Sequence, residues 1–462
     1  MKHFDAIIIG SGQGGTPLSK KLAKKGWKTA LIEMKDVGGS CINVGCTPTK
    51  AMIASAKAAY NIQQSGTLGI DAGSFKINMP AVIQRKKKIV EKFRYASQHA
   101  LEHTENLSLI FGEATFVNSK TIQIELNKGG VETFSANKIF INTGTRPAIP
   151  GIEGLNDVGY FTSTTLMEYE EIPPHLLVVG SGYIGLEFGQ MYRRFGSKVT
   201  ILEKSERFLK KEDEDIAKEI LKFLKAEDIE VLTNAQAMNL KNGSDFISAT
   251  LDVDGEKKII KCSHILVSAG RIPNTEKLQL QNAGVNADHR GYIIVNEKLE
   301  TSVEGVYAIG DVKGGPEFTH ISYNDYVILY NNLINGKNES TINRMVPYTM
   351  FTDPQLGRIG ITEQEARKKN LNIKVARLSM SRVARAIETG DTRGVMKAIV
   401  DAETENVLGA AIVGAEGGEI MSVLEMAIAG GIKFREIRDM VFAHPLYSES
   451  LNNLFMTIEH LD

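Results

Sequence analysis

Two cysteines, Cys41 and Cys46, have four residues between them in the segment GGSCINVGCTPTK, and the chain of 462 residues has only one other, Cys262. A disulfide that closes so short a loop adds little stability to a chain of this length. Bridged Cα atoms lie within about 7 Å of each other, so the intervening residues must fold back, which Asn43 and Gly45 favour. The spacing predicts a redox-active dithiol. Two unlinked buried thiols and half of a metal site are the alternatives, but no second cysteine pair or nearby histidine would complete such a site.

The N-terminal segment has the pattern of a dinucleotide-binding unit. Residues 5–9 read as a buried strand and residues 10–15 as a glycine-rich turn, and a helix follows to about residue 25. A second strand at 28–32 leads into an acid, Glu33. Glycines in such a turn let backbone amides approach a pyrophosphate, and the helix N-terminus adds partial positive charge. The acid can accept hydrogen bonds from a ribose diol.

The same pattern recurs in the middle of the chain. A strand at 176–179 is followed by a glycine-rich turn at 180–185, a helix to about residue 194, a strand at 199–202 and the acid Glu203. The acid stands at the same distance from the first glycine in both copies, so chance is a poor explanation. Two dinucleotide sites beside a dithiol predict an electron relay from nicotinamide to flavin and from flavin to a disulfide.

Length and charge narrow the class of protein. A chain of 462 residues is expected to form three or four domains, at about 100 to 200 residues each. Its formal charge of -1 is not that of a nucleic-acid binder. The apolar run at 6–9 is too short for a membrane span or signal peptide, so we expect a cytoplasmic enzyme without membrane contact. A reducing cytosol suits a transient catalytic disulfide.

With these motifs the chain resembles the class I pyridine nucleotide-disulfide oxidoreductases, the flavoenzymes that include glutathione reductase, dihydrolipoyl dehydrogenase and mercuric reductase. The resemblance covers nearly the whole length and rests on the dithiol segment, INTGTRP (141–147), GSGYIGLE (180–187), SAGRIPN (268–274), TSVEGVYAIGD (301–311) and HPLYSESLNNLF (444–455). It implies an α/β fold with two Rossmann-like dinucleotide-binding domains and a C-terminal α+β dimerisation domain. The implied domains are an FAD-binding domain 1–148, an NAD(P)-binding domain 149–270, a central domain 271–342 completing the FAD site, and a dimerisation domain 343–462.

The resemblance assigns catalytic roles to the matching residues. Cys46 would be the charge-transfer thiolate against the flavin, and Cys41 the interchange thiol that attacks substrate. A helix starting near Cys46 would favour the thiolate. Lys50 would lie near flavin N5, paired with Glu187.

His444 and Glu449 match the acid–base dyad of the family's tail. The histidine would exchange a proton with Cys41, while the carboxylate fixes the tautomer and stabilises the imidazolium. In the family this dyad reaches the dithiol of the other subunit, which implies a homodimer with a shared active site.

FAD and NAD(P)H are the implied cofactors, FAD at the first fingerprint and NAD(P)H at the second, and no metal site is expected. The residues expected to bind them are Gly10, Gly12, Gly14, Gly15, Glu33, Gly39, Ser40, Thr143, Gly144, Asp311, Thr319, Gly180, Gly182, Tyr183, Ile184, Gly185, Glu203, Gly270 and Arg271. Tyr183 resembles the residue that covers the flavin in glutathione reductase, with core packing as the alternative. Glu203 would repel the 2′-phosphate of NADPH and so favours NADH, although Lys204 and Arg207 follow closely.

For the oxidant, the closest resemblance is to mercuric-reductase-like flavoproteins that include the copper-reducing reactive-chlorine-defence reductases. We therefore expect electrons to pass through the dithiol to a small-molecule disulfide or a metal ion. Dihydrolipoyl dehydrogenase is the first alternative, because the dyad and Glu203 agree with it, although Leu446 and Tyr447 depart from the usual HPT tail. Mercuric reductases carry a C-terminal cysteine pair where this chain reads His460-Leu461-Asp462, and they typically lack the dyad histidine. A non-enzymatic flavoprotein sensor or a one-cysteine oxidase would have no use for the dithiol and dyad together.

Hydrophobic patterns predict further elements. We expect helices over 53–103, strands over 111–124 and 131–141, an antiparallel sheet with helices after residue 344, and a turn at 414–418. Cys262, in a strand-like run from 261 to 269, is expected to be a small core residue.

Overall fold

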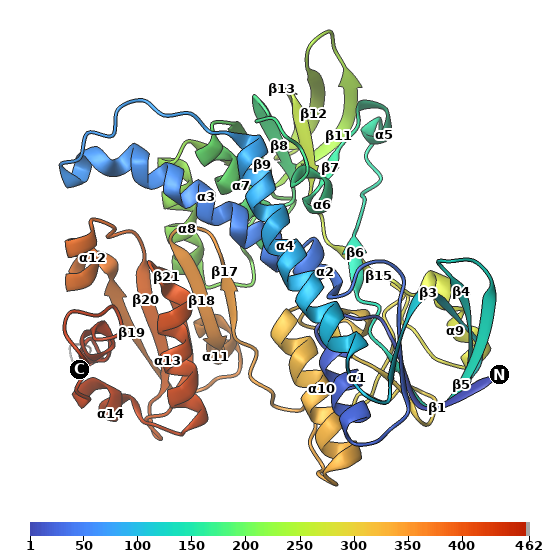
Figure 1. Cartoon of the computed structure of the whole chain (residues 1–462). Helices are drawn as coiled ribbons and strands as arrows, with labels where there is room; N and C mark the ends of the chain where they lie inside the picture. The colour runs from blue at the N-terminus through green and yellow to red at the C-terminus, as the bar shows by residue number, and fades with distance from the viewer. Residues whose placement is uncertain (459–462) are drawn as a thin grey trace. The chain divides into compact units, whose positions relative to one another are not determined.

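The computed structural model describes residues 1–458, which form two compact units (Figure 1). Unit 1 combines Met1–Ala51, Ala81–Ala148 and Gly270–Arg344, and unit 2 combines Met52–Pro80, Ile149–Ala269 and the chain from Met345 onward. The predicted chain end at His460–Asp462 lies outside the described residues. No helix in residues 1–458 is long and apolar enough to cross a bilayer.

Unit 1 is built on a parallel sheet in which β1 lies between β2 and β5. Strand β3 extends the sheet beside β2, β16 extends it beside β5, and β4 runs antiparallel to β3 and β5. The strands are β1 (Lys2–Ile9), β2 (Thr29–Glu33), β3 (Leu107–Asn118), β4 (Thr121–Leu126), β5 (Val131–Ile141) and β16 (Val306–Ala308). The stretch 111–124 is two strands, because the Asn118 side chain accepts from Lys120 N at 3.0 Å and turns the chain.

Helices cover this sheet. They are α1 (Gly15–Lys24), α2 (Gly39–Asn43), the start of α3 (Cys46–Gln64), most of α4 (Met79–Glu102), α9 (Leu280–Ala283) and α10 (Thr319–Ile334). Leu18 and Leu22 stand four residues apart on α1 and share a buried core with Ile8, Ile328 and Leu329. Burying each such side chain stabilises the unit by about 1.5 to 3 kcal/mol. This packing fixes the glycine turn that precedes α1.

Unit 2 contains a second parallel sheet of five strands, in the order β10-β9-β8-β14-β7. Its elements are β7 (Phe161–Thr162), β8 (His175–Val179), α7 (Tyr183–Phe195), β9 (Lys198–Leu202), α8 (Glu214–Ala226), β10 (Ile229–Leu232) and β14 (His264–Val267). An antiparallel sheet of β11 (Ala235–Asn242), β12 (Ile247–Val253) and β13 (Glu256–Cys262) follows β10. Cys262 is 2% exposed and ends β13, so its prediction as a core residue is confirmed, although the run 261–269 is not one strand.

The C-terminal part of unit 2 is a five-stranded antiparallel sheet, as predicted, with α13 packed on β18 and β21. It comprises β17 (Tyr348–Met350), β18 (Gln355–Gly360), β19 (Ile373–Ser379), β20 (Val395–Asp401), β21 (Val407–Gly414), α13 (Gly417–Ala429), α14 (Phe434–Asp439) and α15 (Ser450–Met456). The predicted turn lies between β21 and α13. The remaining elements are short: η1 (Ser65–Leu68), β6 (Thr145–Pro147), α5 (Leu155–Val158), α6 (Ser163–Leu166), β15 (Arg271–Pro273), η2 (Glu276–Leu278), η3 (Gly310–Lys313), α11 (Glu363–Lys368), η4 (Met380–Arg382) and α12 (Ala384–Thr389).

Candidate active site

The two cysteines of the dithiol segment are brought together by a helical turn. Cys41 lies in α2, where Val44 N donates to Ser40 O at 2.9 Å, and Cys46 is the first residue of α3. A Cβ on Gly45 would lie 2.8 Å from Ser40 O, so a larger residue could not connect the two helices in this path. The expected fold-back of the chain is therefore made by helix α2 and the two residues that follow it.

The two cysteines are not joined by a disulfide in this structure; Cys46 is exposed, and Cys41 is partly buried. A hydrogen bond with Cys46 raises the pKa of the Cys41 thiol, as do burial and the negative charge of Cys46, while Thr319 and Lys50 act in the opposite direction. Cys46 Sγ also lies 3.5 Å from Thr319 Oγ1. The raised pKa keeps the proton on Cys41.

Two helix N-termini meet at Cys46. Cys46 begins α3, and Thr319 begins α10, a helix of 16 residues. The unpaired N–H groups of a helix start favour a nearby anion. The contact between Thr319 and Cys46 is something the sequence did not reveal.

The first glycine-rich loop packs against the end of β5 and against the dithiol segment. A Cβ on Gly10 would lie 2.4 Å from Asn142 O, and one on Gly15 would lie 2.1 Å from Gly10 O. A Cβ on Gly39 would lie 2.8 Å from Gly12 Cα. Side chains at these positions would push the loop, the strand end and the dithiol apart.

Asn142 joins three parts of unit 1. Its Oδ1 accepts from Gly15 N at 2.8 Å, and its Nδ2 donates to Ile309 O at 2.9 Å and lies 3.4 Å from Ser322 Oγ. The side chain is buried. The sequence analysis named the two following residues but missed Asn142, although it stands in the motif INTGTRP.

Glu33 is tied to the loop that precedes it. Its Oε2 accepts from Ser11 N at 3.0 Å and Ser11 Oγ at 2.6 Å, and its Oε1 accepts from Lys35 N at 2.8 Å. These bonds hold the carboxylate at the end of β2, where a ribose diol would be recognised.

The residues of unit 1 fit FAD. Thr143 Oγ1 is buried beside the glycine loop and has no hydrogen-bond partner within residues 1–458. Asp311, just after β16, accepts from Thr145 Oγ1 at 3.2 Å, and burial raises the pKa of its carboxyl while Arg271 opposes this. A buried hydroxyl and a partly buried carboxyl are groups that the ribityl hydroxyls of FAD would satisfy.

The second fingerprint repeats the geometry of the first. A Cβ on Gly180 would lie 2.6 Å from Ser268 O, and one on Gly185 would lie 2.1 Å from Gly180 O. Ser268 follows β14 as Asn142 follows β5, and its Oγ donates to Gly180 O at 2.9 Å. Nothing within 4 Å would meet a Cβ on Gly182, which leaves open space before α7.

Glu203 repeats the arrangement of Glu33. Its carboxylate accepts from the Ser181 hydroxyl and, at 2.6 Å, from Ser205 N. Each acid is therefore held by the serine of its own loop and by the backbone N–H two residues further on. This internal repeat includes side-chain contacts that the glycine pattern does not show.

Tyr183, the first residue of α7, is held by a buried acid. Its hydroxyl donates to Glu212 Oε1 at 3.0 Å, Tyr348 donates to the same oxygen at 2.5 Å, and the two rings lie 5.3 Å apart. Arg358 lies 3.7 Å from the other carboxylate oxygen. Burial and then the charge of Glu212 raise the pKa of both tyrosines. Glu212 was not among the predicted site residues.

The remaining predicted cofactor residues lie in loops and at helix starts. Gly14 caps α1, Ile184 follows Tyr183 in α7, Ser40 lies in α2, and Gly144 has a φ of 67° just after β5. Gly270 precedes β15, Arg271 is its first residue, and Arg271 Nε donates to Thr145 Oγ1 at 2.7 Å.

Lys50 and Glu187 lie in different units. Lys50 lies in the part of α3 that belongs to unit 1, and the buried Glu187 lies in α7, where its Oε1 accepts from Phe351 N at 2.9 Å. Their pairing stays a prediction.

His444 and Glu449 form a hydrogen-bonded pair. His444 Nδ1 lies 2.9 Å from Glu449 Oε2 and 3.1 Å from Oε1. Because the carboxylate accepts, Nδ1 carries the proton, and Nε2 is left to exchange protons with another group. The histidine side chain is 69% exposed, so a second molecule can reach it.

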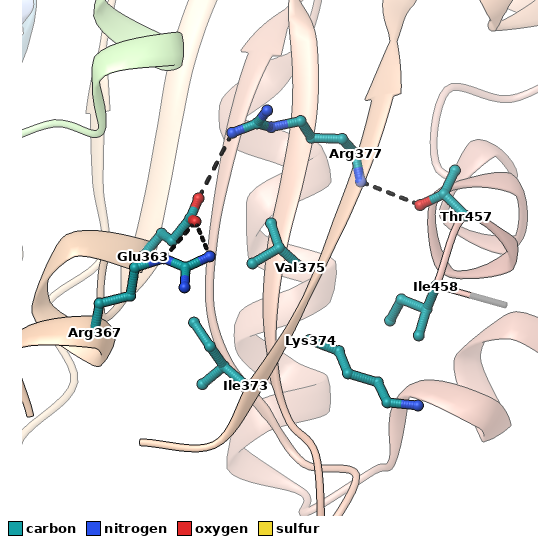
Figure 2. Close-up of a pocket in the computed structure, with 8 residues that line it drawn as sticks. All are labelled: Glu363, Arg367, Ile373, Lys374, Val375, Arg377, Thr457 and Ile458. Atoms are coloured by element: carbon teal, nitrogen blue, oxygen red, sulfur yellow. Dashed lines mark hydrogen bonds and ion pairs between the residues drawn. The ribbon is translucent and has the colours of Figure 1, made fainter. Parts of the chain in front are cut away.

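One cavity in the described part of the chain contains none of these residues. It encloses about 570 Å³ beside β19 and is lined by Glu363, Arg367, Ile373, Lys374, Val375, Arg377, Thr457 and Ile458 (Figure 2). Glu363 holds Arg367 and Arg377 there by ion pairs. No group of three His, Cys, Asp or Glu side chains in residues 1–458 has the geometry of a metal site.

Comparison with known proteins decides the family. The family described as pyridine nucleotide-disulphide oxidoreductase matches residues 4–325, and its dimerisation domain matches residues 346–455. The chain belongs to this family. The predicted α/β fold, the enzyme class, the use of FAD with a pyridine nucleotide and the redox-active disulfide are thereby confirmed.

Individual relatives agree with this assignment. The chain is 36% identical to a probable pyridine nucleotide-disulfide oxidoreductase RclA of Escherichia coli, over 99% of this chain and 100% of that protein. It is 33% identical to a mercuric reductase of Lysinibacillus sphaericus (99% and 83% covered) and 32% identical to a dihydrolipoyl dehydrogenase of Geobacillus stearothermophilus (96% and 94%).

Solved structures show the same relationship. The HOCl-induced flavoprotein disulfide reductase RclA from Escherichia coli superposes with a TM-score of 0.90 at 36% identity, covering 98% of this chain and 100% of that one. Its Cu(II) complex superposes with a TM-score of 0.91, covering 99% of both chains.

Proposed function

We propose that this chain reduces a small disulfide or a metal ion with electrons from NAD(P)H, through a Cys41–Cys46 disulfide. The observation that carries the proposal is the placement of an accessible Cys46 at two helix N-termini, in hydrogen-bond contact with Cys41. Bound FAD would accept two electrons from the nicotinamide and deliver them to this disulfide. Glycine loops, Glu33 and Asp311 would hold it in unit 1.

With a disulfide substrate, the thiols act in sequence. Cys41, once deprotonated, attacks one substrate sulfur, and the other sulfur leaves as a thiol after taking up a proton. Cys46 then attacks Cys41, which restores the enzyme disulfide and releases the second substrate thiol. Each round consumes one NAD(P)H and one proton and yields two thiols. Because its pKa is raised, Cys41 needs a base for the first step.

We assign that base to His444 of a partner subunit. Its Nδ1 is bonded to Glu449, which leaves Nε2 to take the proton of Cys41 and return it to the leaving thiol. Apolar side chains exposed in the same C-terminal region support a dimer face there, including Met426 at 73% exposed and Val441 at 96%. The matched dimerisation domain agrees with this assignment.

Mixed dimers test the shared site. A Cys41→Ser subunit and a His444→Ala subunit, inactive alone, would together restore one of the two sites. Equal mixing would then give about a quarter of wild-type activity, because about half the dimers are mixed. If both parents bind FAD and fold but the mixture stays inactive, the shared site is wrong.

The oxidant is best identified by comparing turnover with several candidates. After anaerobic reduction with NADH, the protein would be offered lipoamide, glutathione disulfide, Cu(II) and Hg(II) in turn. Turnover with Cu(II) would follow the RclA relative, whose complex with this ion is known. Turnover with lipoamide alone would establish the dihydrolipoyl dehydrogenase alternative, which the His444–Glu449 pair favours. Loss of both sulfurs, in Cys41→Ser with Cys46→Ser, should abolish turnover with the preferred oxidant, and full activity in that variant would refute the proposal.

Three further assignments belong to the same proposal. Glu203, anchored by Ser181 and Ser205, supports a preference for NADH over NADPH. The division into domains at 1–148, 149–270, 271–342 and 343–462 is supported by unit boundaries near 148, 269 and 344, although residues 52–80 group with unit 2. We place the activity in the cytoplasm, where a reducing pool suits a transient disulfide.

A further inference from the structure

Two histidines stand on one face at the end of α4, away from the residues described above. His99 lies in the last turn of α4 (Met79–Glu102), and His103 follows the helix directly. His103 N donates to His99 O at 3.2 Å, so the helical hydrogen-bond pattern continues through both residues. Residues four apart on a helix are neighbours on its surface. Both side chains are exposed.

The two rings lie close and nearly parallel. Their centroids are 4.0 Å apart, with an angle of 19° between the ring planes. Zinc–imidazole bonds are about 2.0 to 2.1 Å long, so two nitrogens sharing one ion lie within about 4 Å of each other. The rings are therefore close enough for both Nε2 atoms to reach one ion, once the side chains rotate out of the stacked arrangement so that their lone pairs converge.

The tautomer of His103 is already set for metal binding. Its Nδ1 lies 2.8 Å from His99 O. A carbonyl oxygen only accepts, so Nδ1 carries the hydrogen, and the lone pair of the neutral ring is on Nε2. Histidines that bind metals usually make such a bond through the other ring nitrogen.

The surroundings favour a cation. Glu102 lies between the two histidines in sequence, and its carboxylate accepts from Gln98 Nε2 at 2.8 Å. Tyr95 covers the other side of His99, with ring centroids 5.8 Å apart. Glu102 thus adds negative charge to the same end of α4, and no three-ligand group is present in residues 1–458.

We propose that His99 and His103 form a surface site for a divalent transition-metal ion, with water completing the coordination. Imidazole suits Cu(II), Ni(II) and Zn(II), and Cu(II) binds such nitrogen ligands most tightly. The site is separate from the dithiol, and it revises the expectation that the chain holds no metal.

Copper titration of the oxidised holoenzyme tests this inference, because a closed disulfide leaves no active-site thiolate to compete. Bound Cu(II) would be counted by equilibrium dialysis, and its nitrogen ligands would be read from the electron paramagnetic resonance spectrum. His99→Ala and His103→Ala should each raise the Kd of one bound Cu(II) per subunit by about tenfold or more, because each removes one of the two histidine ligands. The spectrum of that ion should lose its two-nitrogen pattern.

Two matched variants separate this site from general histidine binding. His289→Ala removes an exposed single histidine and should change nothing. Gln98→His combined with His103→Ala keeps two histidines but sets them about 100° apart around the helix, and it should not restore binding. If His99→Ala and His103→Ala bind copper as the wild type does, or if the displaced pair binds equally well, the inference is wrong. Turnover with NADH should be unchanged in all of these variants, so the result is independent of the proposed function.

Discussion

Replacement of Asn142 by alanine should loosen unit 1 at the point where the glycine loop, β5 and the segment after β16 meet. The asparagine amide bonds Gly15 N at 2.8 Å and Ile309 O at 2.9 Å, and all three residues are buried. Alanine leaves both backbone groups without a partner and without ready access to water. Each buried unsatisfied group costs about 1 to 3 kcal/mol, so the two together cost about 2 to 6 kcal/mol.

Denaturant unfolding of the holoenzyme, followed by flavin fluorescence, measures this loss in the unit that binds FAD. Asn127→Ala is the matched control, because Asn127 also bonds a backbone carbonyl, Met34 O at 3.0 Å, but is exposed. The control should change the unfolding free energy by less than about 0.5 kcal/mol. If Asn142→Ala costs no more than this control, Asn142 does not hold the loop, and the reasoning is refuted.

Three other predictions concern single acidic residues. Glu449→Gln, which keeps the shape of the pair but not its charge, should lower turnover by about tenfold or more, because the His444 imidazolium loses its counter-charge; turnover within twofold of wild type would contradict the dyad. Burial alone would raise the pKa of Asp213, but backbone N–H groups and the Lys397 ammonium at 3.0 Å lower it below its usual value. The ionised Asp213 therefore stabilises the folded protein above about pH 4, and this contribution to the unfolding free energy is lost as the pH falls further. In Asp213→Asn the unfolding free energy should therefore fall less steeply with pH below about pH 4 than in the wild type. An unchanged pH dependence would exclude this contribution. Because of Glu203, kcat/KM should be higher with NADH than with NADPH, and Glu203→Gln should bring the two kcat/KM values closer together. A preference for NADPH in the unaltered enzyme would show that Glu203 does not select NADH.

Local motifs were enough to predict the family and much of the architecture. The two fingerprints predicted the strands, helices and acids of both parallel sheets, because glycine turns and terminal acids act over a short stretch of chain. The alternation of apolar residues after 344 predicted the antiparallel sheet. The split of 111–124 into two strands was missed, because the Asn118 turn interrupts the apolar pattern for only two residues.

Other features depend on residues far apart in the sequence. Asn142 is distant in sequence from Gly15 and Ile309, and Glu212 is distant from Tyr348, so no spacing rule could pair them.

The sequence by itself determined which chemistry this protein can perform, because the dithiol, the two fingerprints and the dyad are each contained in a short segment. Only the tertiary structure showed that the pKa of Cys41 is raised, because a hydrogen bond with Cys46 and burial both favour its protonated form. Thr319, at the start of the distant helix α10, lies beside Cys46 and acts on the pKa of Cys41 in the opposite direction. A hydrogen bond between distant segments exists only after folding, and so the electrostatics of the dithiol could not be derived from the order of its residues.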